Sequence, residues 1–179
     1  MDPVVTGTLC LVLALLFGGG ALRKTRDLVG FAAIVEHYEL LPRMLVSSVA
    51  GALVASEGAL ALLLVVPATR ELGALGAAGM LLVYSAAIGI NLARGRRDID
   101  CGCAGAAVGR RGLAPELLAR NALLLGAALL AALPVETRPL VWLDPISIAL
   151  GVVTLALTWN AAGQLAATAP ALLRRRMSA

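Results

Sequence analysis

Long apolar stretches separated by short polar segments dominate the chain. Crossing about 30 Å of hydrocarbon takes about 20 helical residues, because each residue of an α-helix rises about 1.5 Å. Five stretches meet this length, and they run from Val4 to Leu22, Met44 to Val66, Leu72 to Ala93, Leu117 to Leu133 and Ile146 to Ala167. The pattern therefore predicts an all-α integral membrane bundle of about five transmembrane helices.

The segment between the first and second stretches has a different pattern. Leu28, Phe31, Val35 and Tyr38 recur at steps of three and four residues, which places them on one face of a helix. We expect a short amphipathic helix that lies in the membrane interface and ends before Pro42. A helix that docks a partner is the alternative.

The composition excludes a soluble globular domain. Apolar residues make up 60% of the 179 residues and charged residues only 15%, whereas soluble domains have about 45–50% and about 25%. Nothing basic precedes the first apolar stretch, and Arg23 follows it, which favours a retained span over a cleaved signal peptide. Without a repeat or a long linker, the sequence predicts one transmembrane domain over residues 1–179.

The basic residues predict the orientation. Fifteen Lys and Arg against eleven Asp and Glu give a net charge of +4. Arg70 and Arg138 lie on one side of the predicted spans, and Arg120 lies inside the fourth span. The other twelve share the opposite side, and they are Arg23, Lys24, Arg26, Arg43, Arg94, Arg96, Arg97, Arg110, Arg111, Arg174, Arg175 and Arg176. The positive-inside rule then places the N-terminus outside and the C-terminus in the cytoplasm of a bacterial inner membrane, and the basic charge indicates topology rather than nucleic-acid binding.

Cys101-Gly102-Cys103 follows the third span and is the main candidate for chemistry. Two cysteines at i and i+2 fall within disulfide reach, and a small, strained disulfide tends to be labile or catalytic. Gly102 relaxes the backbone between the two sulfurs. Asp100 is adjacent to Cys101 and either opposes thiolate formation or relays a proton. We therefore predict a redox-active dithiol at Cys101 and Cys103.

The charges around the two thiols support this hypothesis. Arg94, Arg96, Arg97 and Asp98 precede them, and the segment from residue 94 to 111 has five Arg and two Asp. Positive surroundings favour the thiolate, which is the nucleophile in thiol–disulfide exchange. The alternatives are incidental loop cysteines, or a metal site in which the two thiolates supply half of a zinc shell or bind copper(I).

Cys10 lies within the first span, on the far side of the membrane from the Cys-Gly-Cys segment. Three spans separate the two positions, so Cys10 cannot resolve a disulfide there. We expect it to be a buried, inert thiol.

Three polar residues inside the spans are further candidates. Glu57 lies near the middle of the second span, where a charge costs several kcal/mol unless it is paired, neutralised or hydrated. It is either a protonated interhelical hydrogen-bonding group or a proton-exchange group for the thiols or a bound quinone. Arg120 and Asn121 begin the fourth span, and Arg120 could simply extend to the interface. No sequence motif for quinone stands out, so no cofactor is assigned.

The run from Asn91 to Gly105, NLARGRRDIDCGCAG, closely resembles the signature of the MauE family of methylamine utilization proteins, within a wider group of DoxX-like, redox-associated membrane proteins. Further matching positions are Phe31-Ala32, the segment from Tyr38 to Pro42, Glu57, Arg120-Asn121 and Asp144-Pro145. The resemblance implies a four-helix DoxX-like core plus one further helix.

The resemblance also implies a function. Family members are thought to assist processing, transport or disulfide formation of the small, quinone-bearing subunit of methylamine dehydrogenase, together with a thioredoxin-like MauD-type partner. Cys101 and Cys103 would then be the redox pair of a thiol–disulfide oxidoreductase component. The rival is a non-catalytic scaffold, or a copper or zinc delivery protein, for the thioredoxin-like partner. The charge pattern places the thiols in the cytoplasm, whereas the implied partners work in the periplasm.

Overall fold

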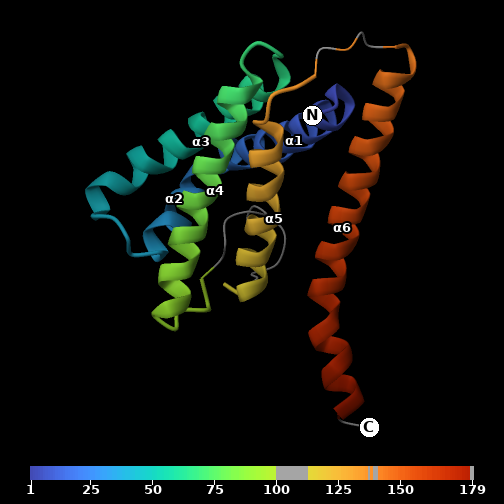
Figure 1. Cartoon of the computed structure of the whole chain (residues 1–179). Helices are drawn as coiled ribbons and strands as arrows, with labels where there is room; N and C mark the ends of the chain where they lie inside the picture. The colour runs from blue at the N-terminus through green and yellow to red at the C-terminus, as the bar shows by residue number, and fades with distance from the viewer. Residues whose placement is uncertain (100–112, 137, 139–140, 178–179) are drawn as a thin grey trace.

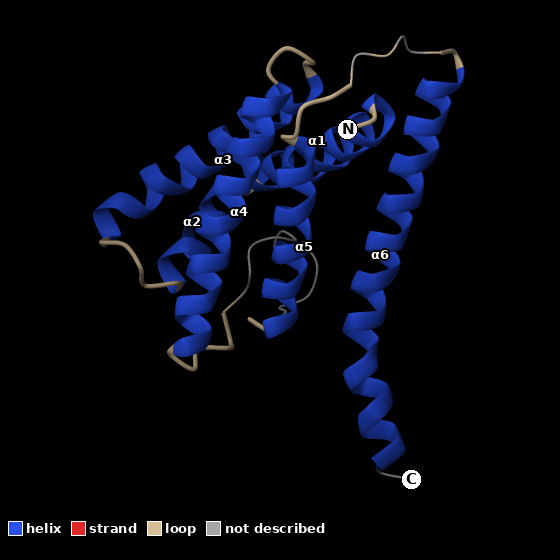
Figure 2. Cartoon of the chain, viewed as in Figure 1, coloured by secondary structure: helices blue, strands red, loops and turns tan. Residues whose placement is uncertain are grey.

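The structure, a computed structural model, describes residues 1–99, 113–136, 138 and 141–177, and its side chains are described as far as residue 159 and at 161. The described residues form six α-helices and no strand (Figures 1 and 2). The helices are α1 (Pro3–Arg26), α2 (Leu28–His37), α3 (Arg43–Val65), α4 (Arg70–Ala93), α5 (Pro115–Ala131) and α6 (Leu143–Met177). The predicted all-α fold is confirmed.

All five predicted spans are helical, but they differ in how well they suit a membrane. By length and composition, α1, α3 and α4 are long and apolar enough to cross one. α5 has 17 residues, so it is about 25 Å long, slightly less than the hydrocarbon thickness. In α6, the apolar part found among the described residues is Leu143–Trp159. The structure thus confirms a helical membrane bundle. Within the residues that it describes, three helices meet the length and composition of a span, where the sequence predicted about five.

Helix α1 extends one turn beyond the predicted end at Leu22, as far as Arg26. Asp2 caps its first turn by accepting a hydrogen bond from the backbone N–H of Val4 at 2.7 Å, and Pro3 occupies a position that favours helix initiation. The extra turn matters for function because it places Lys24 inside the bundle, where that side chain is buried.

The central core joins α1, α3, α4 and α5 through apolar and small side chains. Leu13 and Phe17 of α1 meet Leu64 of α3, Ala77 of α4 and Ala128 of α5. Small side chains let these helices approach closely in lipid.

The amphipathic helix predicted between the first two spans is α2. Phe31 is buried and packs with Ala21 of α1 and with Ala50 and Val54 of α3. Leu28, predicted on the same face, is 41% exposed, so the contact face is narrower than predicted. α2 therefore packs against the bundle rather than forming a detached connector.

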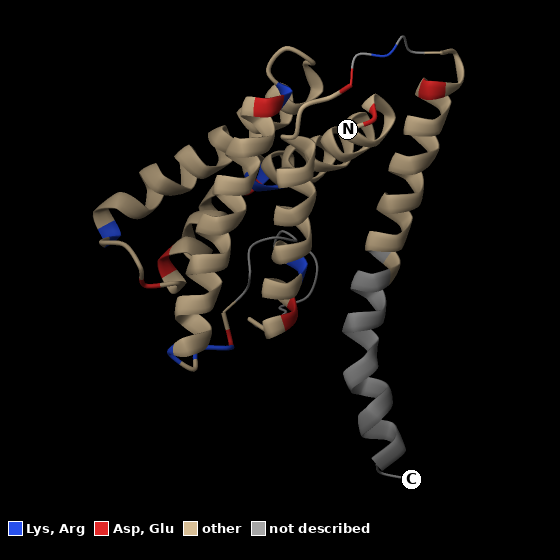
Figure 3. Ribbon diagram, viewed as in Figure 1, with Lys and Arg blue, Asp and Glu red and all other residues tan. Residues whose placement is uncertain are grey.

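The two ends of the bundle are distinct in Figure 1. The N-terminus, the α3–α4 turn and the α5–α6 connection lie at one end, and the C-terminus lies at the other. Most charged residues lie at helix ends and in connections (Figure 3). α6 packs along α1, where a Cβ on Gly151 would lie 2.9 Å from Thr8 Cγ2. Because the start of α1 and the end of α6 lie at opposite ends of the bundle (Figure 1), the fold agrees with an odd number of membrane crossings.

Candidate functional site

The C-terminal end of α4 depends on Gly95, the glycine of the Arg-Gly-Arg-Arg sequence at residues 94–97. Gly95 has φ +73°, which a residue with a side chain rarely adopts. Its N–H donates to the carbonyl of Leu92, and the N–H of Arg96 donates to that of Asn91, both at 3.0 Å. These two bonds form a Schellman motif, which ends a helix and redirects the chain. The glycine in the signature is thus explained by the helix end.

The segment that contains the two thiols is fixed at both ends. The N–H of Leu113 donates to the carbonyl of Arg97 at 2.7 Å, and Ile99 and Leu113 are buried together with Ile88 of α4. Tyr38, Leu92, Leu117 and Leu118 pack around this cluster. Asp100, Cys101, Gly102 and Cys103 lie outside the described residues, so the redox pair stays a prediction.

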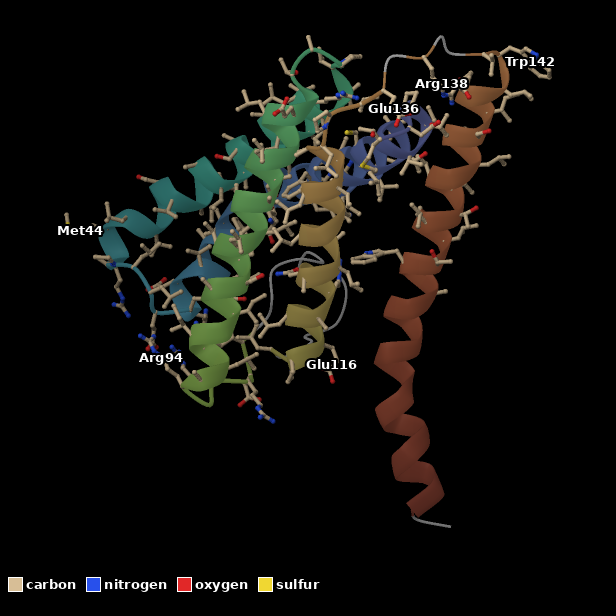
Figure 4. The ribbon with its side chains drawn as sticks, in the orientation of Figure 1. Met44, Arg94, Glu116, Glu136, Arg138 and Trp142 are labelled. Atoms are coloured by element: carbon tan, nitrogen blue, oxygen red, sulfur yellow. The ribbon has the colours of Figure 1, made fainter. Side chains whose placement is uncertain are left out.

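The charged residues before the thiols are at the surface. Arg94, Arg97 and Asp98 are exposed, and Arg94 lies at the lower end of α4 in Figure 4. Arg96 forms an ion pair with Glu39 at 2.9 Å. An exposed ion pair of this kind contributes little to stability. It does neutralise Arg96, one of the positive charges that the sequence analysis expected to favour the thiolates.

Glu57 of α3 accepts two hydrogen bonds inside the bundle. Its Oε1 lies 2.5 Å from Lys24 Nζ of α1 and 2.5 Å from the hydroxyl oxygen of Tyr84 of α4. Lys24 Nζ also lies 4.8 Å from the centre of the Phe31 ring. Glu57 is 3% exposed and Lys24 is 7% exposed. The buried carboxylate therefore has a buried cation as its partner.

This pairing corrects the assignment of Lys24 to a surface loop. Counted from Leu13, the buried positions Phe17, Gly20 and Lys24 recur at helical steps of four, three and four residues, so one further turn of α1 carries Lys24 onto the same face. The spacing was visible in the sequence, but Lys24 lies between Arg23 and Arg26 and therefore resembled part of a surface cluster. One of the twelve positive charges on that side thus lies inside the bundle.

Glu57, Arg120 and Asn121, predicted separately, line one small cavity. Its volume is about 60 Å³, and Gly20, Lys24, Tyr84, Ile88 and Leu117 are among the other lining residues. Asn121 donates to the Ser85 hydroxyl at 3.2 Å. The structure thus brings together the intramembrane polar residues that the sequence singled out, and it adds Lys24 and Tyr84, which the sequence did not.

Arg120 also contacts the last helix. Its guanidinium lies 4.4 Å from the centre of the Trp159 ring of α6, which is a cation–π geometry. The side chain therefore has a partner within the protein, and extension to the membrane interface is not needed to explain it.

Two side chains belong both to the cavity and to the apolar cluster at the ends of the thiol-bearing segment. Ile88 and Leu117 line the cavity and also belong to the cluster around Ile99 and Leu113. The described residues next to the thiol-bearing segment therefore contact side chains that line the cavity.

A second polar cluster lies at the opposite end of the bundle, close to the N-terminus (Figure 4). Arg138 binds Asp2 at 3.0 Å and Asp144 at 2.9 Å, and thereby ties the start of α1 to the start of α6. The hydrogen bond from Arg138 holds the pKa of Asp2 below its ordinary value of 3.8. The sequence named Asp144 only as a matching position; the link through Arg138 to Asp2 could not be found from local spacing, since Asp2 is distant in the chain.

Two further expectations concern cysteine and metal. Cys10 is 4% exposed and packs in the central core, which confirms a buried thiol. Within the part of the chain that the structure describes, no group of three or more His, Cys, Asp and Glu side chains is placed to hold a metal ion.

Comparison with known proteins gives a consistent family match. The model of the family "Methylamine utilisation protein MauE" matches residues 2–134. The protein named methylamine utilization protein MauE of Paracoccus denitrificans is 42% identical over 103 residues, which cover 58% of this chain and 55% of that protein. The protein of the same name from Methylorubrum extorquens is 37% identical over 162 residues, which cover 90% of this chain and 82% of that protein. The match thus spans about half the length of the first relative, and no solved structure matches this chain.

Proposed function

The chain belongs to the MauE family of methylamine utilisation proteins, and from this premise we propose that it is a membrane thiol–disulfide redox protein that assists maturation of the small subunit of methylamine dehydrogenase. One observation supports the proposal most. The Cys101-Gly102-Cys103 sequence lies between two chain positions, Ile99 and Leu113, that are buried against the same helices. The residues that flank the dithiol in the sequence are therefore held against the bundle.

The chemistry follows from thiol–disulfide exchange. One cysteine, as the thiolate, attacks a disulfide of the partner, forms a mixed disulfide and releases one partner thiolate. The second cysteine attacks the first, closes the Cys101–Cys103 disulfide and releases the second partner thiolate. The dithiol is oxidised by two electrons and the partner disulfide is reduced by two; the reverse sequence oxidises the partner.

The proposed partner is a thioredoxin-like protein of the MauD type, and the proposed substrate is the small subunit. The positive charge on the thiol side favours the cytoplasm for the dithiol, whereas the proposed substrate is periplasmic. We infer that the dithiol transfers reducing equivalents between the two sides, or that its segment folds into the bundle and is reached from the other face.

Replacing both cysteines by serine tests the proposal. The Cys101→Ser/Cys103→Ser variant should accumulate in the membrane like the unchanged protein and should fail to support formation of active methylamine dehydrogenase in a strain lacking its own copy. Cys10→Ser is the matched control, since that thiol is buried in the core, and it should support full maturation. Full maturation by the double variant would contradict the redox proposal and favour the scaffold.

Single substitutions separate the remaining alternatives. If exchange occurs, one of Cys101→Ser and Cys103→Ser should trap a mixed disulfide with the partner that reductant releases, because the resolving thiol is missing. A metal-delivery role predicts instead that the purified protein binds copper or zinc stoichiometrically and loses it on thiol alkylation.

A further inference from the structure

We propose that Glu57 forms a hydrated proton-exchange site inside the bundle, at which its second carboxylate oxygen binds water in the cavity between α1, α4 and α5. The inference rests on side chains of α1, α3, α4 and α5 and does not depend on the thiol chemistry. It gives the Glu57 carboxylate a task beyond pairing with Lys24.

The two oxygens of Glu57 have different surroundings. Oε1 accepts from Lys24 and Tyr84. Oε2 is fully buried and has no hydrogen-bond partner among the described residues. An unpaired buried carboxylate oxygen is unfavourable because the water that solvated it has not been replaced, so a donor at this position would be stabilising.

The unpaired oxygen lies at the cavity. A Cβ on Gly20 would lie 3.3 Å from Glu57 Oε2, and both Gly20 and Glu57 line the cavity. Because Gly20 has no side chain, the space next to Oε2 stays open.

The volume of the cavity indicates what fits. It is about 60 Å³, and a water molecule takes a share of about 30 Å³ in the liquid. Sites for drug-sized molecules measure about 300–1,000 Å³. A few water molecules therefore fit, whereas a quinone ring does not suit this space.

The groups that face Glu57 supply partners for that water. Lys24 and Arg23 come from α1, Tyr84 from α4, and Arg120 and Asn121 from α5. Among the lining residues that the structure describes, Glu57 is the only carboxylate. Arg23 also lines the cavity and is exposed, so water has a route from the end of α1.

The exchange step is a simple proton transfer. A hydronium ion in the cavity gives its proton to Oε2, which yields a carboxylic acid and a water molecule, and the reverse step restores the ion pair with Lys24. Lys24→Met removes the buried cation that pairs with Glu57, and because a buried charge without a partner is unfavourable, we expect this variant to hold the proton on Oε2.

Infrared spectroscopy of the purified full-length protein tests the site. In Lys24→Met at pH 7 we expect a carboxylic-acid band that is absent from Lys24→Met/Glu57→Gln and that shifts to its deuterated position as soon as the protein enters D2O. A band that stays unshifted would show a dry carboxyl and overturn the proposal. The absence of any band attributable to Glu57 would overturn it as well.

Two neighbouring glycines of α1 provide matched variants in the same background. Gly20→Ala adds a methyl group beside Oε2 and should slow the D2O shift several-fold. Gly19→Ala adds the same group at a position where the nearest atom, Arg23 Nη1, is 3.5 Å away, and it should leave the rate of the D2O shift unchanged. Equal rates in the two variants would contradict the proposed water position.

If Lys24→Met does not fold, the infrared comparison is made at acid pH between the otherwise unchanged chain and Glu57→Gln.

Discussion

The Lys24–Glu57 pair shows what one buried charge requires of its neighbours. Taking two charges out of water is costly, and removing one partner of a buried pair typically costs about 3–5 kcal/mol. We therefore expect Lys24→Ala to lower the free energy of unfolding by about that amount, as measured by denaturant unfolding in detergent. The double variant Lys24→Met/Glu57→Leu should recover most of the loss, because both charges are then absent.

An exposed pair provides the control for this prediction. Arg43 lies 3.0 Å from Glu36, and the two side chains are 90% and 48% exposed. Arg43→Ala should change the free energy of unfolding by less than about 1 kcal/mol. If Lys24→Ala had no larger effect than Arg43→Ala, the buried pair would not be a stabilising element of the bundle.

Gly95 gives a second prediction at the scale of one residue. Gly95→Ala places a side chain in a left-handed conformation, φ +73°, so we expect it to lower the free energy of unfolding by about 1–2 kcal/mol. Gly79→Ala lies within α4, and no atom is within 4 Å of the added Cβ. This substitution should be neutral or stabilising by up to about 1 kcal/mol. Equal unfolding midpoints for the two variants would refute the role of the Schellman motif.

The residue scale also shows which functional positions a sequence reveals. Glu57 was predictable because a carboxylate is conspicuous in an apolar span. Lys24 was missed because it lies among other basic residues at the end of a span, and Tyr84 because a hydroxyl on an aromatic ring hardly changes the apolar pattern. The roles of Lys24 and Tyr84 depend on their contact with Glu57 on another helix, and that contact can be found only when the facing sides of the helices are known.

At the scale of elements, the attachment of α6 to α1 depends on small residues. A Cβ on Gly151 would lie 2.9 Å from Thr8 Cγ2 and one on Gly7 would lie 3.1 Å from Ile148 Cδ1. We expect Gly151→Leu to lower the free energy of unfolding by about 1–3 kcal/mol because the crossing becomes overpacked. It should also change the fluorescence of Trp159 in a Trp142→Phe background, since α6 then moves relative to Arg120.

Gly126→Leu on α5 is the matched substitution, because nothing lies within 4 Å of a Cβ at that position. It should leave the Trp159 fluorescence and the unfolding midpoint nearly unchanged. A similar response to both substitutions would mean that the α1–α6 crossing does not depend on close approach at Gly151.

The elements themselves were largely predictable, and their lateral arrangement was not. The apolar stretches located all five long helices, and the three- and four-residue spacing located α2. Hydropathy could not show that α5 has only 17 residues or that α6 packs mainly along α1, because both properties depend on where the chain turns and on which small residues meet. The family signature located the thiol segment, whose fixed ends became visible only through the burial of Ile99 and Leu113.

At the scale of the whole molecule, Arg138 joins the starts of the first and last helices. The pKa of Asp2 is lowered by its hydrogen bond to Arg138. Ionised Asp2 therefore stabilises the folded chain at a pH above its ordinary pKa, and this contribution is lost as the pH falls through the lowered pKa. We expect Arg138→Gln to lower the apparent Tm at pH 7, and we expect this difference in Tm to shrink as the pH falls below 3.8 and through the lowered pKa of Asp2. A difference in Tm that stayed constant over this range would contradict an ion-pair contribution.

The orientation of the bundle decides where the thiols work, and two sets of residues at opposite ends can report it. Trp142, before α6, is 76% exposed and lies near Arg138 (Figure 4), whereas Arg94 caps the far end of α4 and the two thiols follow Arg94 in the sequence. With the N-terminus outside, a membrane-impermeant maleimide should label Trp142→Cys in intact cells, in a background where Cys10, Cys101 and Cys103 are serine. The same reagent should label Cys101 and Cys103 of the otherwise unchanged chain only after permeabilisation, because the positive charges favour the cytoplasm for that side. If the two thiols react in intact cells while Trp142→Cys does not, the bundle has the opposite orientation, and the dithiol faces the side on which the proposed partner works.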